Sequence, residues 1–204
     1  MARRLILAFD TSAAHCAAAL LSGDCLVTRR FEAMDKGQAE RLLPLLEEVL
    51  ADGGAGWHDL DALAVGTGPG NFTGVRIAVA AARGLALALD IPAIGVTRLE
   101  ALAHGLPRPL TVIEDARRGE VYVQPFAAEG AGPARLEPAG PLPPGALTGS
   151  AAGPDALPPA MPLAEAIARV AAGRAGTPAR PAPFYLRGAD AAPPADPPPV
   201  ILPG

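Results

Sequence analysis

The sequence predicts an α/β protein in two lobes, and three observations point to this fold class. Three short apolar runs near the N-terminus are followed by alternating helix and strand patterns, as expected where helices cover a sheet. A glycine-rich segment leads straight into a long apolar helix. Of the 24 prolines, only three precede residue 105. We therefore expect an N-terminal lobe over residues 1–105 and a reduced, proline-rich C-terminal lobe with an extended tail over residues 106–204.

The first three elements are predicted to be strands. Leu5 to Phe9 is a continuous apolar run that ends in Asp10-Thr11-Ser12, which indicates a buried strand followed by a polar turn. Residues 16–21 and 25–31 are the next two strands, because Ser22-Gly23 supplies the chemistry of a tight turn between them.

The two cysteines flank that turn. The expected hairpin register places Cys25 opposite about Leu20, away from Cys16. A disulfide needs Cα atoms within about 7 Å, which this register does not provide. We therefore expect two reduced thiols in the core.

The next elements alternate. Gln38 to Leu50 carries apolar residues at helical spacing, and Gly53-Gly54 ends it. Pro44 lies inside this pattern and predicts a kink or a late helix start. A short strand, residues 63–65, then feeds the glycine loop and a helix from about Thr73 to Leu89.

The rest of the chain is predicted to be less regular. We expect little regular structure from Ala127 to Pro162. The tail from Pro181 is expected to be extended, with polyproline geometry at its proline runs, Pro193-Pro194 and Pro197 to Pro199. The other expected elements are strands at 91–96, 110–113 and 120–126, a turn at 117–119, and helices at 97–104 and 163–172.

Charge and hydropathy exclude several classes of protein. The net charge is −4 and Lys36 is the only lysine, which argues against non-specific nucleic-acid binding. The N-terminal apolar run is too short for a signal peptide. Arg76, Arg83 and Asp90 cut the longest apolar run below the ~20 residues that a bilayer requires, so no membrane association is expected. A cytoplasmic protein is the remaining expectation.

The helix from Thr73 has small or apolar residues on nearly every face, so it is expected to be buried on more than one side. One side can lie on the sheet, and a partner subunit is the simplest cover for the other. The alternative is that both long helices pack only on the sheet and on each other. The residues expected at a partner interface are Leu42, Leu46, Gly74, Val75, Ala78, Ala81, Ala82 and Leu85.

Several segments together resemble the actin-like ATPase superfamily (ASKHA, ribonuclease H-like fold) and, within it, the TsaB (YeaZ) family. The most specific is Gly68-Pro69-Gly70-Asn71-Phe72-Thr73-Gly74-Val75-Arg76. The other matching segments are residues 6–12, 40–44, 94–97, 115–122 and 185–187, in family order. The chain departs from the family at Gln38, where the family often has His, and in its short, proline-loaded C-terminal lobe.

The resemblance implies a two-lobed actin-like fold and a non-catalytic subunit. Such a subunit binds a TsaD-type catalytic subunit, with a TsaE-type ATPase, and supports threonylcarbamoyl transfer to the tRNA adenosine next to the anticodon. Contact with tRNA is then expected through the complex, without a cofactor of its own. The resemblance leaves open whether the chain forms a homodimer when alone.

Metal catalysis is not expected. The related TsaD subunit carries two metal-binding histidines on the helix after the Ile-Pro-Ala-Ile strand, and Arg98 and Leu102 occupy those positions here. Neither side chain is a metal ligand. The chain's histidines, His15, His58 and His104, lie in separate segments without ligand spacing.

Nucleotide binding is the main alternative function, as in an ATP-binding transferase or kinase of the superfamily. Asp10 and Thr11 have the chemistry to hold magnesium and phosphate, or they cap backbone groups at the strand end. The glycine loop either cradles phosphate or permits close helix packing, which we favour. A peptidase is disfavoured, because neither Ser12 nor Ser22 is expected to have a nearby histidine that activates it.

The turn that matches the superfamily's second phosphate loop carries two carboxylates, in Glu114-Asp115-Ala116-Arg117, which would repel a triphosphate. Asp115, Arg117, Glu120 and Tyr122 form the densest polar cluster in the sequence. They either hold a substrate between the lobes or form a hairpin turn with an Asp–Arg pair. The residues of a vestigial nucleotide or cleft site would then be Asp10, Thr11, Asp115, Arg117 and Glu120.

Overall fold

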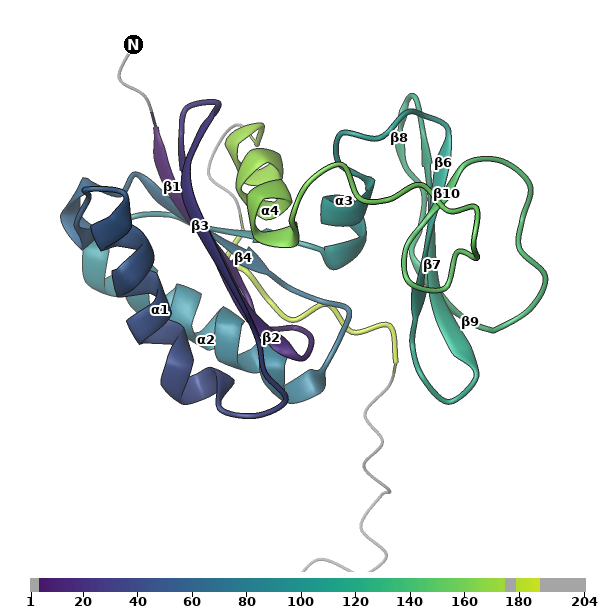
Figure 1. Ribbon diagram of the computed structural model, residues 1–204, viewed down its shortest axis with the longest axis horizontal. Helices are drawn as coiled ribbons and strands as arrows, with labels where there is room; N and C mark the ends of the chain where they lie inside the picture. The colour runs from purple at the N-terminus through teal and green to yellow at the C-terminus, as the bar shows by residue number, and fades with distance from the viewer. Residues whose placement is uncertain (1–3, 175–178, 188–204) are drawn as a thin grey trace, which may run out of the picture.

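The computed structural model describes residues 4–174 and 179–187, and Figure 1 shows two sheets side by side with helices around the first. The first sheet has the strand order β3-β2-β1-β4-β5. The first three strands are antiparallel, and β4 and β5 run parallel to β1. This is the actin-like, ribonuclease H-like arrangement. The strands are β1 (Leu5–Asp10), β2 (His15–Ser22), β3 (Cys25–Ala33), β4 (Ala62–Gly66) and β5 (Ala93–Val96).

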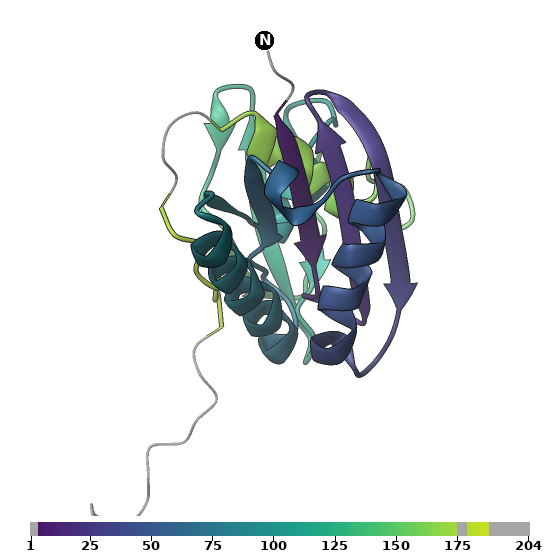
Figure 2. The same cartoon turned by 90° about the vertical axis from the view of Figure 1, so that its left-hand side faces the viewer.

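Helices cover both faces of this sheet. Figure 2 shows α1 (Gln38–Asp52) and α2 (Phe72–Leu89) side by side on one face, and α4 (Leu163–Ala172) lies on the other. Leu7 and Phe9 of β1 pack toward α1 and α2, whereas Ile6 and Ala8 pack toward α4. Because both faces are buried, β1 reads as a continuous apolar run rather than an alternating one. A short 3₁₀ helix, Trp57–Asp59, precedes β4.

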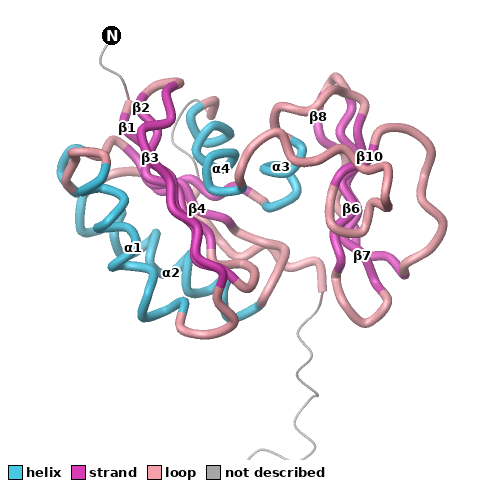
Figure 3. Tube along the Cα trace, viewed as in Figure 1, coloured by secondary structure: helices cyan, strands magenta, loops and turns pink. Residues whose placement is uncertain are grey.

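The second sheet has the order β10-β6-β7-β8, with β9 also paired to β7. A short helix, α3 (Arg98–Ala103), lies between the two sheets in Figure 3. Leu102 of this helix packs in the same cluster as Val112 and Phe126 of the second sheet. The strands are β6 (Leu110–Asp115), β7 (Glu120–Ala127), β8 (Gly130–Ala131), β9 (Arg135–Pro138) and β10 (Leu147–Thr148).

Two expectations about local structure need correction. The helix α1 begins at Gln38 and continues through Pro44, so the predicted late start is wrong. Proline there removes only the one hydrogen bond that its nitrogen cannot donate, and five buried residues hold the helix on the sheet. The segment from Ala127 to Pro162 was expected to be irregular, but it contains β8, β9 and β10. These strands are only two to four residues long, too short for a periodic pattern.

The cysteines also differ from expectation. Ser22 pairs with Cys25, because only Gly23 and Asp24 separate the strands, and Cys16 pairs with Glu32. Cys16 is buried, whereas Cys25 is exposed, so only one of the two is a core thiol. Both are free, as the sequence predicts.

The boundary expected at residue 105 does not separate the layers of the structure. The helix α4 comes from the second half of the chain but packs on β1, β2, β4 and β5. Residues 181–185 also return to the first lobe, whereas Leu186 and Arg187 contact the second. The backbone N–H of Phe184 donates to the Thr67 carbonyl at 2.8 Å, and Arg83 Nε donates to the Pro181 carbonyl at 2.7 Å. The proline runs for which polyproline geometry is expected lie outside the described residues.

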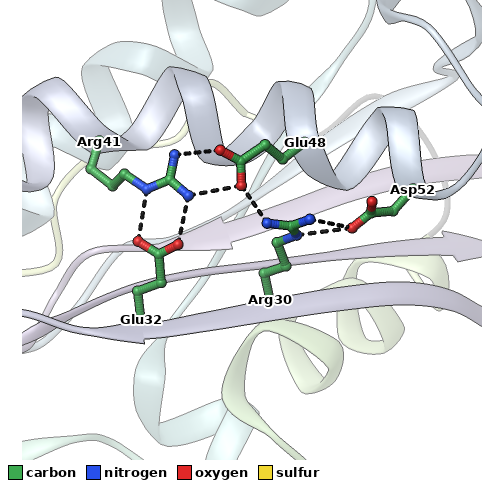
Figure 4. A network of polar contacts seen from close by, with 5 residues as sticks. All are labelled: Arg30, Glu32, Arg41, Glu48 and Asp52. Carbon is green, nitrogen blue, oxygen red and sulfur yellow. Dashed lines mark hydrogen bonds and ion pairs between the residues drawn. The ribbon is translucent and has the colours of Figure 1, made fainter.

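A network of ion pairs joins α1 to the edge strand β3 (Figure 4). The guanidinium of Arg41 contacts Glu32 at 2.6 Å and Glu48 at 2.7 Å. Arg30 pairs with the same Glu48 and with Asp52, which it contacts at 2.8 Å. All five side chains are partly exposed, so the network orients α1 more than it stabilises the chain.

Candidate functional site

The glycine loop packs against the turn between β1 and β2. A Cβ at position 70 would overlap the Ser12 carbonyl oxygen, and one at position 74 would overlap that of Thr11. The hydroxyl of Thr11 donates to the Gly74 carbonyl at 2.6 Å, and the Asn71 N–H donates to the Ser12 carbonyl at 2.6 Å. These glycines therefore serve close packing within the chain, which is the alternative that the sequence favours over a phosphate cradle.

The structure corrects most of the expected partner interface. Six of the eight residues are buried inside the chain, because the face of α1 and α2 that carries them lies on the sheet: Leu42, Leu46, Gly74, Val75, Ala78 and Ala82. Side chains in these positions are not available to a partner. Ala81 and Leu85 are partly exposed.

The exposed face of α2 lies elsewhere on the helix. Ile77, Ala80, Ala81, Gly84, Leu87 and Ala88 are exposed or partly exposed, and their spacing of three and four residues places them on one face. We call this set the apolar face of α2. None of its members is charged, but the exposed Arg76 and Arg83 border it, at three- and four-residue spacing from Ala80 and Leu87. Leu87 is 81% exposed. By length and composition alone α2 could cross a membrane, but a single such helix is weak evidence, since helices of globular proteins share these properties.

Asp10 is the most buried charged residue of the first lobe. Its Oδ1 accepts hydrogen bonds from the Ser12 amide at 3.0 Å, from Ser12 Oγ at 2.9 Å and from His15 Nε2 at 2.8 Å. Burial would raise the pKa of the Asp10 carboxyl. The hydrogen bond from His15, the charges of His15 and Arg98 and the Ser12 amide outweigh burial and hold the pKa below its ordinary value.

The sequence offered a strand-end cap as one of two interpretations of Asp10, and its partner His15 was missed. The imidazole comes from the first residue of β2, and only the tight turn after β1 returns it to Asp10. The sequence signal for this contact was that Asp10 and His15 lie five residues apart, on either side of a tight turn between two expected strands. The contacts to the Ser12 amide are those of a strand-end cap.

Ser12, Asp10 and His15 do not form the relay of a serine hydrolase. Such a relay needs the histidine between serine and aspartate, because the imidazole takes the serine proton. Here the carboxylate lies in the middle and contacts both of the other side chains. Ser12 is 1% exposed and His15 is 7% exposed. The arrangement braces a turn and does not activate a nucleophile.

A cleft of about 640 Å³ lies between the lobes. Asp115 and Arg117 line it, as expected from the sequence, together with Ser12, Asn71 and Arg98. The other three expected residues do not line it. Asp10 and Thr11 are fully buried, and Glu120 pairs with Arg187 at 2.6 Å.

Glu114 closes one wall of this cleft. Its Oε2 contacts Arg98 Nε at 2.7 Å, and its Oε1 accepts the Ser150 amide at 2.6 Å. Three carboxylates, of Asp35, Glu114 and Asp115, line the cleft against two guanidiniums, of Arg98 and Arg117, and Arg98 is already paired with Glu114. The lining therefore has no excess of positive charge to hold a triphosphate.

The positions where TsaD carries its metal-binding histidines have other roles here. Arg98 pairs with Glu114, and Leu102 packs in the core of the second sheet. Within residues 4–174 and 179–187, the structure brings together no group of three His, Cys, Asp or Glu side chains that could hold a metal ion.

Sequence comparisons relate the chain to tRNA-modification proteins. The family model for TsaD, tRNA N6-adenosine threonylcarbamoyltransferase, matches residues 32–132. The tRNA threonylcarbamoyladenosine biosynthesis protein TsaB of Escherichia coli K12 is 43% identical over 123 residues, which are 57% of this chain and 52% of that protein. TsaB of Haemophilus influenzae is 40% identical over 131 residues, 61% of this chain and 54% of that protein. The chain thus matches about half the length of these relatives.

Solved structures extend the similarity over most of the chain. A Pseudomonas aeruginosa protein described as similar to the peptidase YeaZ has a TM-score of 0.74 at 30% identity, covering 90% of this chain and all of its own. YeaZ from the same organism has a TM-score of 0.64 at 31% identity, covering 80% of this chain and 88% of its own. The fold, the glycine loop and these relatives agree, and the chain belongs to the TsaB (YeaZ) family.

Proposed function

We propose that this chain acts in tRNA threonylcarbamoyladenosine biosynthesis as a non-catalytic subunit that binds a TsaD-type catalytic subunit. The TsaB relatives support the pathway, and the apolar face of α2 supports the binding role. Through that complex the chain supports threonylcarbamoyl transfer and reaches tRNA, together with a TsaE-type ATPase. A cytoplasmic location fits this role.

The observation that carries the proposal is the apolar face of α2. Its six side chains are small or aliphatic, and Leu43 of α1 adds a further exposed leucine at 46%. Small residues let a second helix approach closely, so that its ridges fill the groove. A stable interface of ordinary size buries about 800 Å² on each partner. The face is thus suited to a helix of another subunit. When the chain is alone, the same face is open to self-association.

The cleft supports a non-catalytic role. Glu114 and Asp115 line one side of it, and the glycine loop on the other side packs on the β1–β2 turn. An ATP-binding transferase would need free backbone amides or an excess of cations here, whereas the carboxylates of the cleft outnumber its two guanidiniums, Arg98 and Arg117. Asp10 does not line the cleft: its Oδ1 accepts the Ser12 and His15 hydrogen bonds, and its Oδ2 is buried against Gly66 with no hydrogen-bond partner among the described residues.

Co-expression with the TsaD-type protein of the same organism tests the proposal. Leu87→Glu places a charge on the apolar face of α2 without disturbing the core, because Leu87 is 81% exposed. We expect this variant to lose the complex on size exclusion with light scattering, and to lose threonylcarbamoyl transfer in the reconstituted system.

Leu142→Glu is the matched control, since Leu142 is an exposed leucine, at 46%, in the second lobe. It should form the complex as the unaltered chain does. Complex formation by Leu87→Glu, with unfolding curves that match the unaltered chain, would place the interface elsewhere. Absence of any complex with the unaltered chain would reject the binding role itself.

A further inference from the structure

Another hollow, of about 430 Å³, lies beside the C-terminal end of α3. Its walls come from the end of α3, the turn before β6, the β7–β8 hairpin and the end of α4, which meet in the upper part of Figure 1. None of its lining residues belongs to the apolar face of α2 or lines the cleft between the lobes. The volume lies within the range of small-molecule sites, about 300–1,000 Å³.

The charges around this hollow are unequal. His104, Arg108, Arg169 and Arg174 line it, and Glu100 is the only carboxylate among the lining residues. We call it the basic pocket. In a chain with a net charge of −4, three guanidiniums against one lining carboxylate are a local excess of positive charge. Such an excess attracts anions and holds them against competing water.

Two of the three arginines have carboxylate partners. Arg174 contacts Glu100 at 2.6 Å, and Arg169 contacts Glu165 at 2.9 Å. These pairs fix the two guanidiniums at the rim, with their side chains 33% and 28% exposed. A guanidinium has five N–H donors, so each pair leaves donors for a further ligand.

Arg108 has no carboxylate partner among the described residues. Its guanidinium lies 4.6 Å from the centroid of the Phe126 ring, and within the described part of the chain it donates one hydrogen bond, to the Ala103 carbonyl at 3.5 Å. Stacking on the ring fixes the plane of the guanidinium and leaves its edge free to donate. Arg108 is therefore an oriented cation with unused donors.

The protonation equilibria agree with this geometry. Burial, and then the charges of Arg169 and Arg108, lower the pKa of His104 below its ordinary value. Burial also lowers the pKa of Arg108. The shift of His104 means that a further positive charge is unfavourable beside Arg169 and Arg108.

We propose that the basic pocket binds a phosphate-bearing ligand. A phosphate group carries several acceptor oxygens, which match donors that converge from α3, α4 and the turn before β6. Phe126 and Val170 give the pocket an apolar wall, which suits a planar or aliphatic group attached to the phosphate. The phosphate belongs to a free mononucleotide or to an RNA backbone. The proposal does not depend on the proposed function.

Titration of the full chain at low salt tests this inference, with nuclear magnetic resonance of backbone amides and arginine Nε groups as the readout. The probes are inorganic phosphate, adenosine monophosphate and a short single-stranded oligouridylate. We expect saturable shifts at the β7–β8 hairpin and at Arg108. Arg108→Gln should weaken binding about tenfold or more, because a hydrogen bond to a charged group is lost.

Arg135→Gln is the control, because Arg135 is also an exposed arginine of the second lobe but pairs with Glu137 at 2.7 Å, away from the pocket. It should bind the probes as the unaltered chain does. Tighter binding of the oligouridylate than of the mononucleotide identifies the RNA backbone as the source, and equal or weaker binding identifies a small ligand. Absence of hairpin shifts with all three probes at millimolar concentration, or equal weakening by both variants, would overturn the proposal.

Discussion

Two glycines of α2 give a matched test of how this helix is held. Gly74 and Gly84 lie on the same helix, but their surroundings differ. A Cβ at position 84 meets nothing within 4 Å, whereas one at position 74 lies closer than 3.0 Å to the Thr11 carbonyl oxygen. The same change to alanine should therefore have opposite effects on the free energy of unfolding at the two positions.

Gly84→Ala is expected to stabilise the chain. Alanine is favoured over glycine in a helix interior by about 1 kcal/mol, and no clash opposes it here. For a domain of about 150–250 residues this raises Tm by about 2–4 °C.

Gly74→Ala is expected to destabilise it. The clashing atoms belong to the backbone of Thr11, which is fully buried and cannot turn aside. Overpacking costs about 1–3 kcal/mol. Displacing Thr11 also strains its 2.6 Å hydrogen bond to the Gly74 carbonyl, worth about 1 kcal/mol. Subtracting the gain in helix propensity, of at most about 1 kcal/mol, leaves a net loss of about 1–3 kcal/mol.

Urea unfolding followed by circular dichroism and by the fluorescence of Trp57, the only tryptophan, measures both variants. Equal m-values would show that stability alone has changed. If Gly74→Ala were as stable as Gly84→Ala, the glycine loop would not be closely packed on the β1–β2 turn. Phosphate binding by the glycine loop would then become the favoured interpretation.

Three further predictions concern charge and thiol chemistry. In the folded chain the pKa of the Asp10 carboxyl lies below its ordinary value of 3.8, so the ionised carboxylate stabilises the folded chain at a pH above 3.8. This stabilisation is lost as the pH falls through the lower pKa of the folded chain. Asp10→Asn should therefore make the free energy of unfolding depend less steeply on pH in the acid range. Burial raises the pKa of Cys16 to about 11, so a thiol reagent at neutral pH should label the exposed Cys25 quickly and Cys16 only on unfolding, as counted by mass spectrometry. Arg41→Gln should lower Tm slightly in low salt, and the difference should vanish in high salt, because the network of Figure 4 is partly exposed.

The sequence predicted the elements well because their signals are local. The helix Leu163–Ala172 matches its predicted bounds, and the turn at Arg117-Arg118-Gly119 has positive φ at all three residues. Short strands such as Arg135–Pro138 were missed, since their pairing partner, β7, and not their own pattern defines them.

The partner interface was harder to predict, for a physical reason. Helical spacing shows which residues share a face, but it shows which face is inward only when the faces differ in polarity. On α2 they do not: Ala78 is fully buried and Ala80 is exposed, yet both are alanines. The exposed row of Ile77, Ala81 and Gly84 has the same composition as the buried one.

Sites built from distant segments were the least predictable. The basic pocket joins His104 and Arg108 to Phe126 and to Arg169, and each of these lies in an unremarkable local sequence. Only the return of α4 to the first sheet brings Arg169 to the end of α3. No spacing rule connects residues across about 60 positions when their meeting depends on a crossover of the chain.

The helix α2 thus carries small residues that pack in the core and small residues that are exposed. This difference decides how the partner interface has to be tested. Ala78 is 0% exposed, so Ala78→Trp would force a large ring into a closely packed core. Loss of the complex by that variant would follow from loss of the fold and would say nothing about a partner. Leu87→Glu changes the exposed side alone. An association experiment on this helix is informative only when the unfolding curve of each variant is measured beside it, and only the exposed row can separate binding from folding.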